Sequence, residues 1–319
     1  MHPHSFSVLT KSMTGRRKNI IGFLAPQDRL PKLLKEVDGY ILEIYGNLVI
    51  CDHHAPTPYW VQNIWHDPLY IDVTSIKDAA KKLRDLQRNW CYYSFDFHGR
   101  ARLIQENLPH VSAKPIVFFS EKPTAPMGNW CLIDKDTIIA ATHCSSPYPN
   151  GIVNFVENKD IPPTRAYLKL WEAFTHIGRI PQKGDKCIDV GACPGGWSWV
   201  LHETGADVIA VDKAPLDKKI AKLPRIEFLQ ESAFGLDPEK IGQVDWFCSD
   251  IICYPDRLIR LIEKWKNGGY AKNMICTLKL QGETDFNAIH QLAALDPQAE
   301  LIHLYNNKHE LTWIWQSKT

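Results

Sequence analysis

The chain has 319 residues, of which 45% are hydrophobic and 23% are charged, and these proportions exclude a mostly disordered protein. Its 37 basic and 36 acidic residues give a net charge of +1, so total charge favours no class of partner. No apolar run reaches the roughly 18 residues of a membrane helix, and the first residues lack the apolar core of a signal peptide. We therefore expect a cytoplasmic protein that does not contact membranes.

The cysteines and histidines favour neither a disulfide framework nor a metal site. The nine cysteines are scattered without a C-x-x-C pair, which is typical of reduced thiols. The histidines include an adjacent pair, His53 and His54, which we interpret as loop or surface residues. We therefore expect no metal cofactor.

Short apolar runs and an amphipathic segment make up the first half of the chain. Residues 38–52 predict two short strands, and residues 75–87 predict an amphipathic helix with Ser75 as its N-cap. Residues 115–120 and 137–142 predict buried strands. The pattern indicates an α+β region, in which we find no catalytic motif.

Three proline-containing stretches interrupt the middle of the chain, at residues 122–128, 145–151 and 161–164. Such stretches are typical of loops and linkers. We place a domain boundary near residue 156, between the second and third of these stretches. This boundary divides the chain into an N-terminal region, residues 1–155, and a C-terminal domain, residues 156–319.

Strands and helices alternate after this boundary. Strands are predicted at residues 187–190, 207–211, 225–229, 244–249, 274–280, 300–305 and 311–316. Helices are predicted at residues 165–175, with Thr164 as N-cap, at 197–203 and at 255–265. This alternation predicts an α/β domain with a mostly parallel, doubly wound sheet. The last two strands should form a hairpin, which would make one edge strand antiparallel.

The sharpest motif is the string D-V-G-A-C-P-G-G-W at residues 189–197, between a predicted strand and a predicted helix. Ligands of open α/β sheets bind at such strand ends. Gly191, Gly195 and Gly196 let the backbone approach a ligand closely, and the helix N-terminus offers free N–H groups. The motif therefore predicts a cofactor site.

Two further features specify the kind of cofactor. Asp212 ends the next strand, where an acidic side chain can accept hydrogen bonds from both hydroxyls of a ribose. The dinucleotide fingerprint G-x-G-x-x-G would need glycine at position 193, but this position is a cysteine, Cys193, and Pro194 follows it. A nicotinamide-dependent oxidoreductase is therefore disfavoured.

The string at residues 189–197 resembles motif I of the S-adenosyl-L-methionine-dependent methyltransferases of the FtsJ-like class. Its G-A-C-P-G-G-W part is similar to the RlmM branch, which methylates a cytidine 2′-hydroxyl of 23S ribosomal RNA. The resemblance covers residues 160–319 and extends weakly into the first half. It implies a Rossmann-like domain that uses S-adenosyl-L-methionine, with 23S RNA or its precursor particle as partner. It also implies that residues 1–155 form an RNA-docking region, ferredoxin-like or THUMP-like.

The resemblance assigns cofactor contacts to the loop after the first strand and to later strand ends. The residues concerned are Asp189, Gly191, Cys193, Pro194, Gly195, Gly196, Trp197, Asp212, Ser232 and Asp250. Ser232 departs from the pattern, since the RlmM branch has an aspartate there that meets the adenine amino group. Glu231 is adjacent and is the alternative contact.

FtsJ-like enzymes carry a Lys-Asp-Lys-Glu tetrad, which matches Lys169, Asp250, Lys279 and Glu310 in this sequence. A ribose hydroxyl is a poor nucleophile while it is protonated, and we expect Lys279 to accept its proton or to stabilise the alkoxide. A lysine that acts as a base near neutral pH must have its pKa lowered from about 10.4, which burial and a second lysine favour. The sequence leaves open which of the two lysines is the base.

RNA contacts are less specific in the sequence. Arg16 and Arg17 belong to a basic N-terminal cluster, and Arg165 lies one turn before the first tetrad lysine, so each is a candidate for phosphate binding. Trp60 and Trp65 are candidates for stacking on bases, although packing in the core is the favoured interpretation.

These observations predict an RNA ribose 2′-O-methyltransferase that acts on large-subunit ribosomal RNA. A methyltransferase for the ribose of a cap or of tRNA is the alternative within the class, because the tetrad fits any ribose hydroxyl. A non-catalytic protein that binds S-adenosyl-L-methionine or RNA is the alternative from another class.

Overall fold

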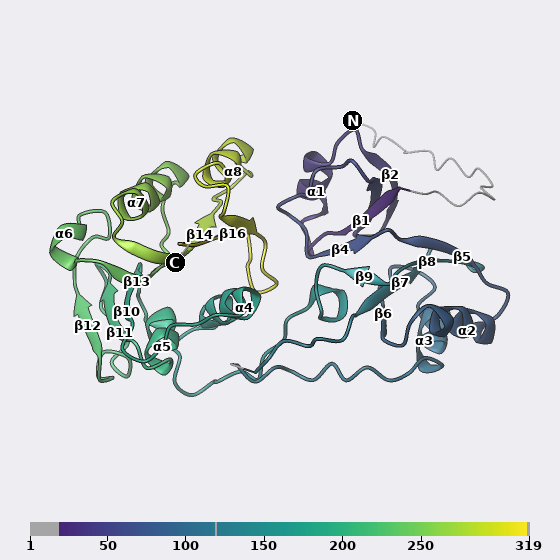
Figure 1. Ribbon diagram of the computed structural model, residues 1–319, viewed down its shortest axis with the longest axis horizontal. Helices are drawn as coiled ribbons and strands as arrows, with labels where there is room; N and C mark the ends of the chain where they lie inside the picture. Colours follow the sequence, from purple (N-terminus) through teal and green to yellow (C-terminus); the bar gives the residue numbers. More distant parts are fainter. Residues whose placement is uncertain (1–18, 119, 318–319) are drawn as a thin grey trace.

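The computed structural model describes residues 19–118 and 120–317 (Figure 1). The candidate phosphate-binding residues Arg16 and Arg17 lie outside these residues. The described residues form three sheets, of which two belong to the N-terminal half and one to the C-terminal half. No helix in the described part of the chain is long and apolar enough to cross a membrane.

The first sheet is antiparallel and has the strand order β2-β3-β1-β4-β9. Its elements are β1 (Ile20–Leu24), α1 (Leu30–Glu36), β2 (Ile41–Tyr45), β3 (Leu48–Asp52), β4 (Asn63–His66) and β9 (His143–Cys144). The two strands predicted at residues 38–52 are thus confirmed. Residues 53–62 join β3 to β4 without a helix, whereas a βαββαβ ferredoxin-like unit has one there.

The second sheet has the order β5-β8-β7-β6 and carries two helices. Its elements are β5 (Leu69–Asp72), α2 (Ile76–Leu86), β6 (Trp90–Tyr92), α3 (His98–Glu106), β7 (Gly128–Leu132) and β8 (Thr137–Ala141). The predicted cap is present, since Ser75 Oγ accepts a hydrogen bond from the backbone N–H of Asp78 at 3.1 Å. The helix at residues 75–87 and the strand at 137–142 are confirmed.

The strand predicted at residues 115–120 was wrong. In the described part of this stretch, Ile116 makes an isolated bridge with Phe155, and Val117 is 64% exposed. Phe118 stacks on Trp171 of the C-terminal half, with 4.6 Å between ring centroids. The apolar residues therefore anchor the stretch to a helix instead of pairing in a sheet, and hydrophobicity alone does not distinguish the two cases.

The third sheet has the order β12-β11-β10-β13-β14-β16-β15. Its strands are β10 (Lys186–Val190), β11 (Asp207–Val211), β12 (Ile226–Leu229), β13 (Val244–Ser249), β14 (Ala271–Lys279), β15 (Glu300–Ile302) and β16 (Glu310–Gln316). The predicted α/β doubly wound architecture is confirmed. The first five strands are parallel, and β16 runs antiparallel to both β14 and β15.

The predicted C-terminal hairpin is confirmed, since β15 at the edge pairs antiparallel with β16, which itself lies inside the sheet. The first five residues of β16 are buried, whereas β15 has three residues and begins with an exposed glutamate. The longer and more apolar strand takes the inner position, and the short strand takes the edge, as is common in natural sheets.

Helices cover both faces of the third sheet (Figure 1). They are α4 (Tyr167–Ile177), α5 (Gly196–Glu203), α6 (Pro238–Ile241), α7 (Pro255–Asn267) and α8 (Phe286–Ala293). Helices α4 and α5 share one core with the sheet, and α7 and α8 share the other. Helix α4 begins at Tyr167, so Thr164 is not its N-cap, and the Thr164 hydroxyl accepts instead from the N–H of Ala166 in the preceding turn.

The N-terminal half packs directly on the C-terminal half. Trp60 is fully buried in the same core as Leu280 and Leu311, and its ring lies 5.4 Å from that of His303. The two halves therefore share a hydrophobic core, which an independent domain on a linker would not do.

A buried carboxylate fixes the turn between the last two strands to α4. Glu172 accepts hydrogen bonds from the backbone N–H groups of Tyr305 and Asn306, at 2.6 and 2.8 Å, and from the Asn306 side chain at 2.7 Å. These three donors compensate for the cost of burying the acid.

We expect Glu172→Ala to lower the free energy of unfolding by about 3 kcal/mol, because it leaves three N–H donors without their partner. Urea denaturation followed by circular dichroism measures this change. Glu263 lies on the exposed side of α7 and serves as the control, since its replacement by alanine should change stability by less than about 0.5 kcal/mol. Equal effects of the two substitutions would contradict the anchoring role.

The buried histidine at the interface between the halves makes stability depend on pH. Burial lowers the pKa of His303 from 6.5 to about 4, and the nearby charges of Arg29 and Lys32 act in the same direction. Between these values the unfolded chain binds a proton that the folded chain does not, so this contribution to stability is lost as the pH falls from 6.5 to 4. Relative to His303→Gln, which does not titrate, the protein should lose about 3 kcal/mol over this range in urea titrations. A constant difference between the two proteins would refute this assignment.

Candidate active site

The carboxyl ends of the parallel strands meet at one edge of the third sheet and border a cavity of about 380 Å³. This volume lies in the range of small-molecule sites. The strand order reverses between β10 and β13, and such a switch point is where open α/β sheets bind ligands. Residues from the predicted set that line the cavity are Gly191, Cys193, Asp212, Ser232, Asp250 and Lys279. Val211, Lys213, Glu231, Ala233, Phe234, Ile251, Ile252 and Arg257 complete the lining.

The loop after β10 needs its glycines for two different reasons. Gly191 has a φ of +80°, and a Cβ there would lie 2.8 Å from the Cα of Ile251, on the opposite wall of the cavity. Gly195 has a φ of +115° and caps α5, and Pro194 before it follows Cys193 through a cis peptide bond. The backbone therefore comes close to the cavity without intervening side chains.

Asp212 connects this loop to the end of β11. Its Oδ2 accepts the N–H of Cys193 at 2.9 Å, and its Oδ1 accepts the N–H of Ala214 at 2.9 Å. Each carboxylate oxygen has a second lone pair, so Asp212 can still accept ribose hydroxyls from the cavity.

Several predicted cofactor contacts lie outside the cavity lining. Asp189 is fully buried, and its Oδ2 accepts from the Ser198 hydroxyl at 2.6 Å, while its Oδ1 has no partner among the described residues. Burial raises the pKa of Asp189 to about 7. Trp197 is also buried, and its indole N–H donates to the carbonyl of Ala166 at 3.0 Å. Pro194, Gly195 and Gly196 also lie outside the cavity lining. These five residues therefore belong to the loop and its support, and they do not border the cavity.

The four tetrad residues come together beside the cavity around the Asp250 carboxylate. Lys169 Nζ lies 2.7 Å and 2.8 Å from its two oxygens, and Lys279 Nζ lies 3.2 Å from Oδ1. Lys279 also donates to the backbone carbonyl of Asp250. Glu310 Oε1 lies 3.1 Å from Lys169 Nζ and thus holds the first lysine from the other side.

The strand register explains this arrangement. Asp250 directly follows β13, and Lys279 ends the neighbouring strand β14. Lys279 pairs with Glu310 in the antiparallel ladder of β14 and β16, because β16 begins where β14 ends. Lys169 reaches the same point from the first turn of α4.

The two lysines differ in access to the cavity. The Lys169 side chain is 9% exposed and lies between two carboxylates, whereas the Lys279 side chain is 19% exposed and lines the cavity. Only Lys279 of this pair therefore has access to a bound molecule.

The sequence analysis missed Thr277, whose hydroxyl donates to Asp250 Oδ1 at 2.7 Å. Its position two residues before Lys279 was a usable signal, because residues i and i+2 of a strand point to the same face. Asp250 thus receives hydrogen bonds from a hydroxyl and two ammonium groups.

The arginine and tryptophan candidates for RNA contact lie elsewhere. The sequence predicted that Arg165 would lie in the helix, one turn before Lys169. In the structure Arg165 lies before α4, which begins at Tyr167. Its side chain is 75% exposed and pairs with Glu157 at 2.8 Å. Trp60 and Trp65 are fully buried, so they pack in the core, and neither has a face free to stack on a base.

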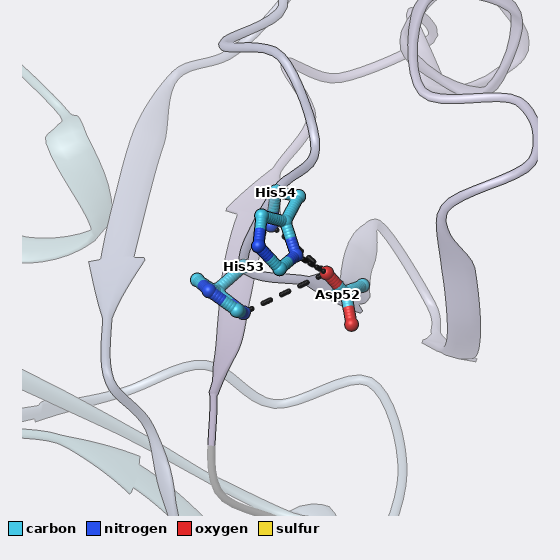
Figure 2. Close-up of side chains that lie close together, drawn as sticks. All are labelled: Asp52, His53 and His54. Atoms are coloured by element: carbon cyan, nitrogen blue, oxygen red, sulfur yellow. Dashed lines mark hydrogen bonds and ion pairs between the residues drawn. The ribbon is translucent and has the colours of Figure 1, made fainter.

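The adjacent histidines group with an aspartate at the end of β3 (Figure 2). His54 Nδ1 lies 2.7 Å and His53 Nδ1 lies 3.6 Å from Asp52 Oδ1, and the potential ligand atoms of the three residues lie within 4.8 Å of one another. Both histidines are exposed, as expected. The backbone N–H of His54 and its side chain hydrogen-bond to the Asp52 carboxylate and lower its pKa, whereas His53 Nδ1 lies 3.3 Å from the carbonyl oxygen of Asn19.

Comparisons with known proteins agree with the site. Residues 163–311 match the family model of the FtsJ-like methyltransferases. Ribosomal RNA large subunit methyltransferase M of Shewanella sp. (strain MR-4) is 29% identical over 236 residues, which are 66% of this chain and 64% of the relative. The protein of the same name from Halorhodospira halophila (strain DSM 244 / SL1) is 32% identical over 172 residues, 52% of this chain and 50% of the relative. The chain thus spans less than two thirds of the curated relatives it matches.

Among solved structures, a ribosomal RNA methyltransferase of Plasmodium falciparum is 19% identical and covers 48% of this chain and 97% of its own, with a TM-score of 0.38.

S-adenosyl-L-methionine is the methyl donor of the FtsJ-like family, and the cavity fits it. Asp212 offers acceptors for the ribose hydroxyls, and Glu231 and Ser232 both line the cavity as candidates for the adenine contact. The backbone of the glycine loop lies at the switch point of the sheet. Motif, topology and family match agree, and residues 163–311 of the chain are similar to the FtsJ-like methyltransferases.

Proposed function

We propose that this chain is an RNA ribose 2′-O-methyltransferase with large-subunit ribosomal RNA as its substrate and the cytoplasm as its location. The observation that carries the proposal is the gathering of Lys169, Asp250, Lys279 and Glu310 at the edge of the cofactor cavity. The names of the curated relatives support the RNA class.

The chemistry assigns separate tasks to the tetrad. S-adenosyl-L-methionine supplies an electrophilic methyl group when it is bound. Lys279 is the tetrad lysine that lines the cavity, so it would accept the proton of the ribose hydroxyl or stabilise the forming alkoxide. Asp250 would orient Lys279 through the 3.2 Å contact.

Lys169 and Glu310 would then act on the position of Asp250. Lys169 contacts both oxygens of Asp250 and one oxygen of Glu310, so the carboxylate cannot rotate without breaking ion pairs. A fixed base and a fixed substrate geometry supply a large share of the rate in transfer reactions. The N-terminal region would contact RNA beyond the target nucleotide, with Arg165 as an exposed candidate for a phosphate contact.

Transfer of a labelled methyl group tests the proposal directly. The protein is incubated with labelled S-adenosyl-L-methionine and, separately, with ribosomal RNA, ribosomal precursor particles, tRNA and capped RNA, and the products are digested to nucleosides. We expect a 2′-O-methylated nucleoside from ribosomal RNA or its particle. Labelling of tRNA or capped RNA alone would assign a different substrate, and cofactor binding without any labelling would indicate a non-catalytic protein.

We expect Lys279→Ala to lower the rate of methyl transfer by about 100-fold or more, because it removes the group that handles the ribose proton. The affinity for S-adenosyl-L-methionine, measured by calorimetry, should stay within about threefold. Lys272 is the exposed second residue of the same strand and pairs with the half-buried Asp245, so Lys272→Ala is the matched control and should leave both values unchanged. If Lys279→Ala abolished cofactor binding instead, the lysine would be structural.

We expect Asp212→Ala to weaken S-adenosyl-L-methionine binding by about tenfold or more, since a charged acceptor for the ribose hydroxyls is lost. Asp212→Asn keeps one acceptor oxygen for the N–H of Cys193 and should lose less. Asp207 lies at the exposed opposite end of β11, and Asp207→Ala is the control in the same calorimetric titration. Unchanged affinity of Asp212→Ala would remove this residue from the ribose contact.

A further inference from the structure

Side chains of α1, which lies outside the residues that match the family, hold the segment that carries Glu310. Arg29, the N-cap of α1, donates through Nε to the carbonyl of Lys308 at 3.4 Å. Lys32 Nζ contacts His309 Nε2 and donates to the Thr284 hydroxyl at 2.6 Å. Lys308 and His309, the two residues before β16, are thus held by the N-terminal half of the chain.

The contact between Lys32 and His309 packs against the buried ring of Trp60. The Lys32 ammonium lies 4.6 Å from the ring centroid of Trp60, which is fully buried, and the same ring lies 5.7 Å from that of His309. Burial lowers the pKa of His309 to about 4 and that of Lys32 to about 8. At neutral pH the imidazole is therefore a neutral acceptor, and most of the lysine is a charged donor.

From His309 the contacts continue into the tetrad. Glu310 follows His309 directly, and the backbone N–H of Lys308 points at Glu310 Oε1 at 3.4 Å. The same oxygen lies 3.1 Å from Lys169 Nζ, which binds both oxygens of Asp250. A displacement of His309 would therefore move the Glu310 carboxylate and loosen Lys169.

We propose that Lys32 is a positioning residue for the methyl-transfer site, which it supports through His309 by fixing Glu310 and, through Glu310, Lys169 and Asp250. The inference rests on the proposed function. It makes the N-terminal half of the chain a part of the active-site framework in addition to any contact it makes with RNA.

Lys32→Met is the sharpest variant, because it keeps an unbranched side chain over Trp60 and removes the ammonium group. We expect kcat to fall about tenfold, as small misplacements of catalytic groups do, with no change in the affinity for S-adenosyl-L-methionine. Lys32→Arg restores a cationic donor and should recover most of the activity. Lys35 lies one turn on in α1, with its ammonium 5.9 Å from the ring of Phe286, and Lys35→Met is the matched control that should keep full activity.

A double-mutant comparison separates positioning from general destabilisation. If Lys32 acts through Glu310, Lys32→Met should cause no further loss of kcat in a Glu310→Gln background. An equal fractional loss in both backgrounds, or an unchanged kcat of Lys32→Met alone, would overturn the inference.

The failure of this inference is distinguishable from the failure of the proposed function. If the unaltered protein methylates no RNA, the proposed function is wrong. The unaltered protein, Lys32→Met, Glu310→Gln and the double variant are then compared by thermal denaturation. The drop in melting temperature caused by Lys32→Met should be smaller in the Glu310→Gln background, because the two side chains belong to one contact network. Additive drops would overturn the network itself.

Discussion

The arrangement of the site depends on the Asp250 carboxylate, which lies between the ammonium groups of the buried Lys169 and the half-buried Lys279. Lys169 and Lys279 are both within 3.2 Å of it, and each would be costly to bury without a counter-charge. The sheet meets this constraint by ending β13 just before Asp250 and β14 at Lys279, with α4 packed where Lys169 reaches both carboxylates. The cavity and the tetrad share this edge, so the fold that neutralises the charges also places a lysine in the lining of the cavity.

The sequence predicted the parts of the site that depend on strand ends. The motif at residues 189–197 and Asp212 follow from alternating strands and helices, since parallel strands end at one edge. Asp250 and Lys279 were assigned through the family resemblance, and they too lie at strand ends. Thr277 was missed although its strand position was available. Lys32 was not predictable, because its role depends on how two distant segments pack.

The errors have equally specific causes. The apolar residues at 115–120 anchor a connector through Phe118 and Trp171, and composition does not reveal whether such a run has a strand partner. The hairpin was predicted, but its position was not, because the order of β15 and β16 depends on their relative burial. Arg165 falls before the helix because α4 begins at Tyr167.

The inner position of β16 limits how this chain can vary. Glu310 is the first residue of β16 and faces Lys279 across the ladder, so its direction is set by the register of that strand. A single-residue insertion or deletion that shifted this register by one would turn the Glu310 side chain to the opposite face of the sheet. The segment of residues 303–309 is also tied at Asn306 to Glu172 and at His309 to Lys32. Among relatives of this chain, length changes should therefore be rare in this short surface turn, where loops ordinarily tolerate them.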